Sequence, residues 1–227
     1  LLYNTQIFST VFKIFLLIGI VAIFHYSYNF LKYFKLYKTE YFIICLFAVT
    51  GMMIMSSAQD LLILYLGIEL LSLSLYTLIG FNKKSIFSSE AAVKYYVLGA
   101  ISSGFLLFGI SLIYGLTGTL SLTEIFDFIK NIQADPASMD LYNVGLIFSL
   151  TFILVSLAFK FGAAPFHMWI PDVYDGALIP TTLLLSTLPK IAIFIVLIKL
   201  LVNAFSGLFV FWSEMILILS IISILVG

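Results

Sequence analysis

Long apolar stretches dominate this chain, and short polar segments separate them. A bilayer span needs about 20 predominantly apolar residues, and runs near that length predict seven spans. Their approximate bounds are 7–26, 41–57, 60–80, 91–115, 142–170, 178–202 and 208–227. The fifth run is interrupted at 162–165, so we expect one broken helix. The pattern predicts an all-α fold, a polytopic membrane helix bundle of about seven transmembrane helices.

The connection at 116–141 has a different pattern from the other loops. Its residues 121–131 alternate apolar and polar positions at helical spacing, which is typical of a helix that lies in the membrane interface. Elsewhere, Gly99 with Ser103 and Ala100 with Gly104 form pairs of small residues four positions apart, which we interpret as helix packing. We predict a single membrane domain over 1–227 with no soluble domain.

The composition agrees with a membrane protein and excludes several kinds of site. The chain has 227 residues, of which 63% are hydrophobic and 10% are charged, whereas a soluble domain carries about 25% charged residues. The formal net charge is zero, so no basic surface for nucleic acid is expected. Because Cys45 is the single cysteine, an internal disulfide and a multi-cysteine metal or iron–sulfur site are excluded.

The lysines gather in alternating loops. Lysines occur in the loops at 31–40 and 81–90, while the connection at 116–141 holds four acidic residues and one lysine. The positive-inside rule therefore predicts that the loops at 31–40 and 81–90 face the matrix or cytoplasm, with the connection at 116–141 on the opposite side.

The predicted break in the fifth span follows a lysine. Lys160 ends the apolar run, and the segment from Gly162 to Pro165 cannot continue a regular helix. Pro165 has no N–H and its ring clashes with the carbonyl of Phe161, so we expect that carbonyl to lose its helical partner. Irregular backbone at membrane depth is tolerated only inside protein or beside a water-filled cavity. An ionisable residue there indicates a functional site, although a snorkelling lysine is the alternative.

A carboxylate occupies the middle of the third span. Glu69 lies far from either end of that span, and Tyr65, Ser72 and Tyr76 fall on the same helical face. A carboxylate at this depth costs several kcal/mol unless something compensates for it. We therefore predict a functional role for Glu69, with a buried carboxyl held for packing as the alternative.

Three further ionisable residues are candidates. Lys190 follows Pro189 in the middle of the sixth span, which places a second lysine beside a second helix defect. Lys94 follows Glu90 by four positions, a spacing that favours a surface ion pair and makes a proton-transfer role the weaker interpretation. His167, close to the break, is either an interfacial residue or a proton relay.

These charges suit proton transfer. Two unit charges 4 Å apart attract by about 4 kcal/mol at an effective dielectric near 20, and doubling the separation halves that energy. A small movement between Glu69 and Lys160 would therefore load or release a proton on the lysine, and Lys190 is a plausible next station. No sequence motif for a nucleotide, flavin, haem or metal ion is present, so we expect no bound cofactor.

Four stretches closely resemble subunit 2 of NADH dehydrogenase, an antiporter-like membrane subunit of respiratory complex I. They are 65–80, 90–118, 159–177 (FKFGAAPFHMWIPDVYDGA) and 186–194. The resemblance covers about residues 41–202 and implies one antiporter-like repeat with a broken helix, in a family whose fold has fourteen helices and two inverted repeats. The family's key glutamate falls on Glu69, its broken-helix lysine on Lys160 and its next lysine on Lys190. A lysine of lesser importance falls on Lys94.

The resemblance implies a proton-translocating subunit of NADH:ubiquinone oxidoreductase in the mitochondrial inner membrane. NAD, FMN, iron–sulfur clusters and ubiquinone would belong to the rest of the complex, whose other membrane-arm subunits and lipids would be the partners. The chain departs from the family at Pro189, where a small residue is expected, and in lacking the second repeat. We therefore expect a further fragment that carries about five helices. The alternatives are a subunit of a multi-subunit cation/proton antiporter and a purely structural membrane scaffold.

Overall fold

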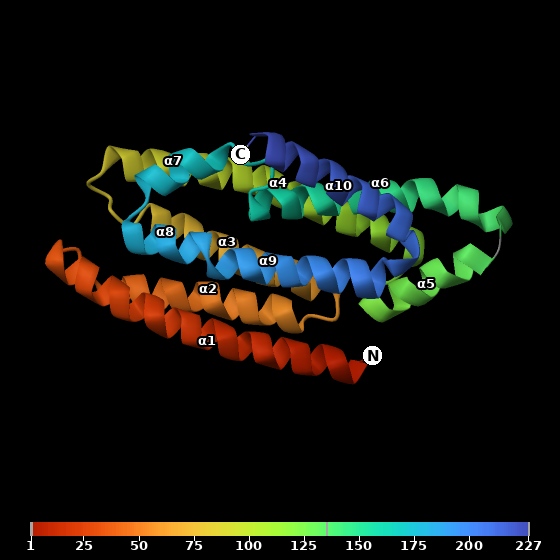
Figure 1. Cartoon of the computed structure of the whole chain (residues 1–227), viewed down its shortest axis with the longest axis horizontal. Coiled ribbons are helices and arrows are strands. Elements are labelled where there is room, and N and C mark those ends of the chain that lie inside the picture. Colours follow the sequence, from red (N-terminus) through yellow and green to blue (C-terminus); the bar gives the residue numbers. More distant parts are fainter. Residues whose placement is uncertain (1, 135, 227) are drawn as a thin grey trace. The chain divides into compact units, whose positions relative to one another are not determined.

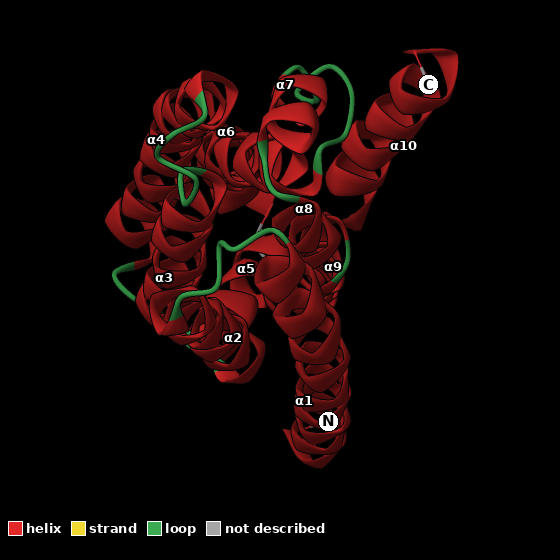
Figure 2. Ribbon diagram, turned by 90° about the vertical axis from the view of Figure 1, so that its left-hand side faces the viewer, coloured by secondary structure: helices red, strands yellow, loops and turns green. Residues whose placement is uncertain are grey.

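The computed structural model describes residues 2–134 and 136–226, with side chains described over 9–133 and 142–226. Within these ranges the chain is helical and contains no strand longer than a single bridge (Figure 2). The α-helices are α1 (Leu2–Tyr33), α2 (Thr39–Ser57), α3 (Leu61–Ile79), α4 (Ile86–Thr117), α5 (Leu122–Ala134), α6 (Pro136–Phe161), α7 (Trp169–Gly176), α8 (Ile179–Ser186), α9 (Leu188–Ile198) and α10 (Phe209–Val226). A π-helix, η1 (Lys199–Ala204), and a 3₁₀-helix, η2 (Ser206–Leu208), lie between α9 and α10.

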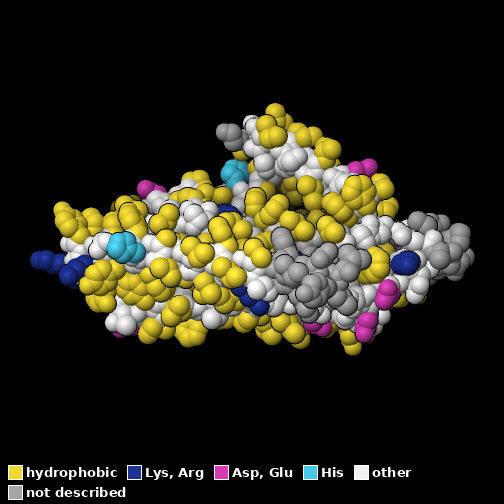
Figure 3. All heavy atoms as spheres, turned by 60° about the horizontal axis from the view of Figure 1, so that its bottom comes forward, with side chains coloured by type: hydrophobic (Ala, Val, Ile, Leu, Met, Phe, Trp, Pro, Cys, Tyr) yellow, Lys and Arg dark blue, Asp and Glu magenta, His cyan; other side chains and the backbone are white. Residues whose placement is uncertain are grey.

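The described residues form seven helical segments that are long and apolar enough to cross a membrane. They are Ser9–Tyr33, Thr39–Ser57, Leu61–Ile79, Ile86–Thr117, Tyr142–Phe161, Ile179–Ala204 and Ser206–Val226. Hydrophobic side chains are spread widely over the face shown in Figure 3, and charged ones are few there, as expected for a surface that meets lipid. The predicted all-α, multi-pass membrane fold is confirmed.

The first span is longer than the sequence predicts. We expected it to end near residue 26, but α1 continues to Tyr33, because residues 27–33 contain neither glycine nor proline. Lys35 then adopts a left-handed backbone with φ of 56°. The Leu36 N–H donates to the Leu31 carbonyl at 2.9 Å, which closes the helix end as a Schellman motif. The polar loop before α2 is correspondingly shorter than 31–40.

The chain divides into two compact units, each built from three segments. The first unit contains the residues through Ala58, 66–98 and 169–192, and the second contains 59–65, 99–168 and the residues from Ile193 onward. The predicted single membrane domain and its repeat region at 41–202 stay predictions.

In the first unit, α1 packs along α2 and α8 (Figure 1). Helices α2 and α3 approach each other at two glycines. A Cβ added to Gly51 would lie 2.7 Å from the Leu71 backbone nitrogen and 2.8 Å from the Gly67 carbonyl oxygen. A Cβ added to Gly67 would lie 2.8 Å from the Met55 backbone nitrogen. The two backbones are therefore in contact, a packing mode that small residues permit in membranes.

Replacing Gly51 by Ala should destabilise this unit. The added methyl group would meet backbone atoms that cannot rotate away, and overpacking of this kind costs about 1–3 kcal/mol. We expect a lower thermal unfolding temperature for the purified protein in detergent. Gly115→Ala is the matched control, because a Cβ there would meet no atom within 4 Å. Equal unfolding temperatures for the two variants would show that α2 and α3 can separate without cost.

In the second unit, the start of α3 is fixed to the segment before α5. The Leu61 N–H donates to the Leu120 carbonyl at 2.9 Å, and the Leu122 N–H donates to the Gln59 carbonyl at 3.0 Å. Helix α5 buries Ile125 on one face and packs against α6 and η1. The predicted helix at 121–131 is therefore present, while its position in the membrane interface stays a prediction.

Helices α4 and α6 approach each other at Gly109. A Cβ there would lie 2.8 Å from Ile153 Cγ1 and 2.9 Å from the Ser149 carbonyl oxygen. The small-residue spacing predicts helix packing for Gly99 with Ser103 and for Ala100 with Gly104. Ser103 does contact Lys160 of α6, whereas a Cβ on Gly104 would meet no atom within 4 Å. Spacing alone did not identify the contact at Gly109, because it does not show which face of α4 turns toward a neighbour.

Candidate functional site

Helix α6 ends at Phe161, next to the predicted break at 162–165. The residue that ends it is Gly162 rather than Pro165. Gly162 has a left-handed backbone with φ of 81°. Its N–H donates to the Phe159 carbonyl at 3.0 Å, and the Ala163 N–H donates to the Ala158 carbonyl at 2.9 Å. These two bonds form a Schellman motif, the usual way in which a glycine closes a helix. Helix α6 has therefore already ended before Pro165, so the expected clash of Pro165 with the Phe161 carbonyl is not the cause.

One backbone N–H of the irregular segment after α6 has its hydrogen-bond partner on α10. A turn closed by the Phe166 N–H on the Ala163 carbonyl at 2.8 Å contains a cis Ala164–Pro165 bond. The Ala164 N–H donates to Ser223 Oγ at 3.0 Å, and the Ser223 hydroxyl donates to the carbonyl of Leu219 in its own helix at 2.8 Å. A side chain of α10 thus provides the partner that irregular backbone requires inside a membrane.

Lys160 lies in the last turn of α6 with only 8% of its surface exposed. Its ammonium donates to Ser103 Oγ of α4 at 3.4 Å. The neighbouring Ser102 hydroxyl lies 3.0 Å from the hydroxyl of Ser156, one turn before the lysine on α6. A hydroxyl group can accept a hydrogen bond from an ammonium and can donate one to a neutral amine, so the Ser103 contact itself suits both forms of the side chain. The spacing of small residues predicts only a packing role for Ser103, because its link to Lys160 spans 57 positions.

Glu69 lies in α3, in the first unit, and is half-buried. Its Oε1 atom is buried and has no hydrogen-bond partner among the described residues. The hydroxyl of Ser72, predicted to share its face, donates to the Ile68 carbonyl at 2.8 Å. A carboxylate oxygen in such a place is costly, which makes Glu69 a functional candidate. Lys160 belongs to the other unit, so the predicted pairing of Glu69 with Lys160 stays a prediction.

The predicted helix defect beside Lys190 is present in the sixth span. Helix α8 ends at Ser186, and Thr187 departs from helical geometry with φ of −112° and ψ of −85°. Pro189 lies in the first turn of α9, where its missing N–H is not needed. Lys190 is half-buried, and its ammonium lies 4.9 Å from the centroid of the Trp169 ring. This distance falls within the range of a cation–π interaction.

Lys94 is an exposed residue near the start of α4. Its ammonium lies 2.8 Å from Glu90 Oε1, the ion pair expected from their spacing, and 2.7 Å from Asp172 Oδ2 of α7. His167 lies in the irregular segment before α7 and is half-buried. Its buried Nδ1 atom has no hydrogen-bond partner among the described residues.

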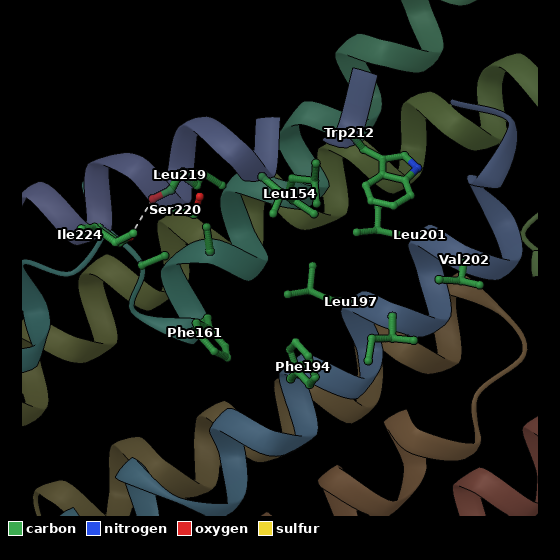
Figure 4. Close-up of a pocket in the computed structure, with 15 residues that line it drawn as sticks. Leu154, Phe161, Phe194, Leu197, Leu201, Val202, Trp212, Leu219, Ser220 and Ile224 are labelled. Carbon is green, nitrogen blue, oxygen red and sulfur yellow. Dashed lines mark hydrogen bonds between the residues drawn. The ribbon is translucent and has the colours of Figure 1, made fainter. Parts of the chain in front are cut away.

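A cavity of about 530 Å³ opens between α6, the α9–η1 segment and α10 (Figure 4). Its walls are almost entirely apolar; Leu154, Phe194 and Leu197 point into it. The hydroxyls of Ser220 and Ser223 donate to carbonyls of their own helix at 2.7 and 2.8 Å. A buried water needs two to four polar partners, so these walls do not support a chain of waters. Within the described ranges, no group of three or more His, Cys, Asp and Glu side chains is placed to hold a metal ion.

Comparisons with known proteins identify the family. Residues 58–227 match the family described as NADH:quinone oxidoreductase/Mrp antiporter, transmembrane. Subunit N of NADH-quinone oxidoreductase from Ruthia magnifica is 45% identical over 96% of this chain and 44% of that protein. The same subunit from Thioalkalivibrio sulfidiphilus is 46% identical over the same shares. The chain thus spans less than half the length of these relatives.

Solved structures agree with these matches. A chain of respiratory complex I from Thermus thermophilus with bound aureothin is 32% identical, with a TM-score of 0.64, over 84% of this chain and 39% of that chain. A chain of the Mrp complex from Dietzia is 21% identical, with a TM-score of 0.61, over 72% of this chain and 29% of that chain. At that identity the Dietzia match shows the fold alone. On its matched residues, its fold and its relatives, this chain belongs to the NADH:quinone oxidoreductase/Mrp antiporter transmembrane family.

Proposed function

We propose that this chain is part of a proton-translocating membrane-arm subunit of an NADH:quinone oxidoreductase, respiratory complex I. The observation that carries the proposal is Lys160, a lysine buried at the end of a membrane helix, beside an irregular segment and a serine hydroxyl. Such a residue is rare at membrane depth and marks ion pathways and proton relays. The similarity to subunit N over 96% of the chain supports the same function.

Each charged residue has a distinct role in this proposal. Lys160 takes up and releases a proton at its Nζ atom, with the hydroxyl of Ser103 as a hydrogen-bond acceptor for the ammonium. Glu69 acts on Lys160 through its charge, because a change of a few ångströms in their separation alters the interaction by about 2 kcal/mol. Lys190 is the next station, and His167 is a candidate relay. Quinone reduction elsewhere in the complex would supply the energy.

The remaining parts of the complex follow from this function. The chain would hold no redox centre, and NAD, FMN, iron–sulfur clusters and the quinone, ubiquinone among them, would bind to other subunits. Its partners would be the other membrane-arm subunits, membrane lipids and the remainder of a subunit about twice this length. The resemblance to subunit 2 of NADH dehydrogenase implies a mitochondrial inner membrane, whereas the relatives are bacterial, so a bacterial plasma membrane is equally supported.

Replacing Lys190 by Ala tests the proposal. We expect proton pumping per NADH oxidised to fall several-fold in inverted membrane vesicles that contain the assembled complex, because alanine cannot carry a proton. Lys199→Ala is the matched control, since Lys199 also lies in the sixth span but begins the π-helix near its end. Normal pumping by an assembled Lys190→Ala complex would remove Lys190 from the pathway.

A cation/proton antiporter subunit is the second candidate, because the matched family includes the Mrp antiporters. The two functions differ in their coupling ion. Pumping in sodium-free vesicles supports the complex I function, whereas transport that requires sodium and not NADH supports the antiporter. A purely structural scaffold predicts that neutralising Glu69 or Lys160 leaves pumping intact.

A further inference from the structure

Helices α4 and α7 are joined by two contacts in the first unit. On the exposed side, the Lys94 ammonium lies 2.7 Å from Asp172 Oδ2. On the buried side, the ring centroids of Tyr95 and Trp169 lie 4.6 Å apart, and both side chains are almost inaccessible to solvent. Lys94 and Tyr95 are consecutive on α4, while Trp169 and Asp172 are three positions apart and therefore neighbours on the surface of α7. One ion pair and one aromatic contact thus fix the same pair of helices.

The same tryptophan also contacts the candidate proton-transfer lysine. The Lys190 ammonium lies 4.9 Å from the centroid of the Trp169 ring. A cation–π attraction is significant only within about 6 Å of the ring and depends on the cation lying over its face. Displacing α7 by one or two ångströms would therefore change the environment of Lys190 without any change to Lys190 itself.

Helix α7 is short, and one of its faces, which carries Trp169 and Val173, is buried. Helix α7 has only eight residues, which is too short to be stable by itself. Its last residue, Gly176, packs closely on α4, where an added Cβ would lie 2.8 Å from the Phe87 carbonyl oxygen. The Thr182 hydroxyl donates to the Tyr174 carbonyl at 3.3 Å. The position of α7 thus depends on tertiary contacts with α4 and α8, and the Lys94–Asp172 ion pair is a charged contact between α7 and α4.

We propose that Lys94 and Asp172 form a clamp that holds α7 against α4 and thereby keeps Trp169 against Lys190. This inference rests on the proposed function of Lys190 and makes Lys94 a positioning residue rather than a proton carrier. An exposed ion pair contributes little to overall stability, typically below about 1 kcal/mol. Its effect should therefore appear in proton pumping, through the geometry at Lys190, more than in folding.

A charge swap distinguishes a clamp from a proton carrier. Lys94→Glu and the double variant Lys94→Glu/Asp172→Lys are made in a Glu90→Gln background. The carboxylate introduced at position 94 then does not also face the carboxylate of Glu90. The Glu90→Gln complex is the reference. Proton pumping per NADH oxidised is measured in vesicles that contain the assembled complex. We expect Lys94→Glu to pump at least threefold less than the reference, because its carboxylate repels Asp172, and the swapped variant to recover at least half of the loss.

The other possible results of this experiment also show whether Lys94 and Asp172 form the clamp. Normal pumping by Lys94→Glu overturns the clamp, and so does a swapped variant that stays as defective as the single one. If Lys94→Glu prevents assembly, recovery of assembled complex in the swapped variant supports the clamp, and its absence overturns it. Lys190→Ala in the same vesicles reports separately on the proposed function. If the Lys190→Ala complex pumps poorly and the swapped variant does not recover, the clamp is rejected but the proposed function of Lys190 stands. If the Lys190→Ala complex pumps normally, the clamp and the proposed function of Lys190 are both rejected.

Discussion

Proton pumping by the assembled complex should fall at least tenfold when Lys160 is replaced by Ala. Alanine carries no titratable proton, and the hydroxyl of Ser103 loses the ammonium that donates to it. Lys160 is almost fully buried, and the sequence of α6 contains no other lysine, so no lysine of the same helix can replace it. The measurement is the membrane potential formed per NADH oxidised in vesicles, with assembly checked by native electrophoresis.

Two further variants make this result interpretable. Lys160→Arg keeps the positive charge but does not release its proton at any ordinary pH, so the part of the activity that it retains beyond Lys160→Ala reports on the charge of Lys160 rather than on its proton transfer. Lys130→Ala removes an exposed lysine from α5 and should pump normally. A membrane potential at the unmodified level in the assembled Lys160→Ala complex would exclude Lys160 from proton transfer.

The second large effect is expected for Glu69→Gln. The amide keeps the shape and hydrogen-bonding capacity of the side chain while it removes the charge, so the complex should still assemble. If Glu69 controls Lys160, the glutamine removes the attraction between the two charges; for any two unit charges about 4 Å apart, that attraction is about 4 kcal/mol at an effective dielectric near 20. We expect pumping to fall at least fivefold, and NADH oxidation to fall with it if the two steps are coupled.

The control for Glu69→Gln is another carboxylate in the same chain. Glu124 is exposed near the start of α5, where it accepts a hydrogen bond from Thr119, and Glu124→Gln should pump normally. Pumping and NADH oxidation are measured on the same vesicles, so that a loss of coupling is distinguished from a loss of electron transfer. An assembled Glu69→Gln complex with normal pumping would argue that the carboxyl group serves only packing.

Hydropathy alone predicted the membrane spans, because a span must be apolar over nearly its whole length. The position of the break was also predictable, since Gly162 and Pro165 are both poor helix formers. Which of the two residues ends the helix was not predictable, because either could have done so. The Schellman motif at Gly162 depends on a left-handed backbone that the sequence permits but does not require. The end of α1 was predicted too early for a similar reason, because the helix closes at a left-handed backbone on Lys35 that the sequence does not require.

The side-chain partners were the least predictable part of the site. The Glu90–Lys94 pair follows from its spacing, whereas the contact of Lys94 with Asp172 joins positions 78 apart. The approach of Lys190 to Trp169 likewise depends on how α7 and α9 fold back on each other. Helical periodicity fixes which residues share a face of one helix, but it carries no information about which other helix that face meets.

The bond between Ala164 and Ser223 also has a consequence for how the chain is made. The two residues are 59 positions apart, and at roughly 5–20 residues per second the ribosome needs on the order of 3–12 s to synthesise the interval. Until α10 has been synthesised and inserted, the Ala164 amide lacks its native acceptor. Because unpaired backbone is not tolerated in contact with lipid, the broken segment should stay close to water or to the insertion machinery during that interval. Insertion of α10 would then be the step that lets the break settle into the membrane.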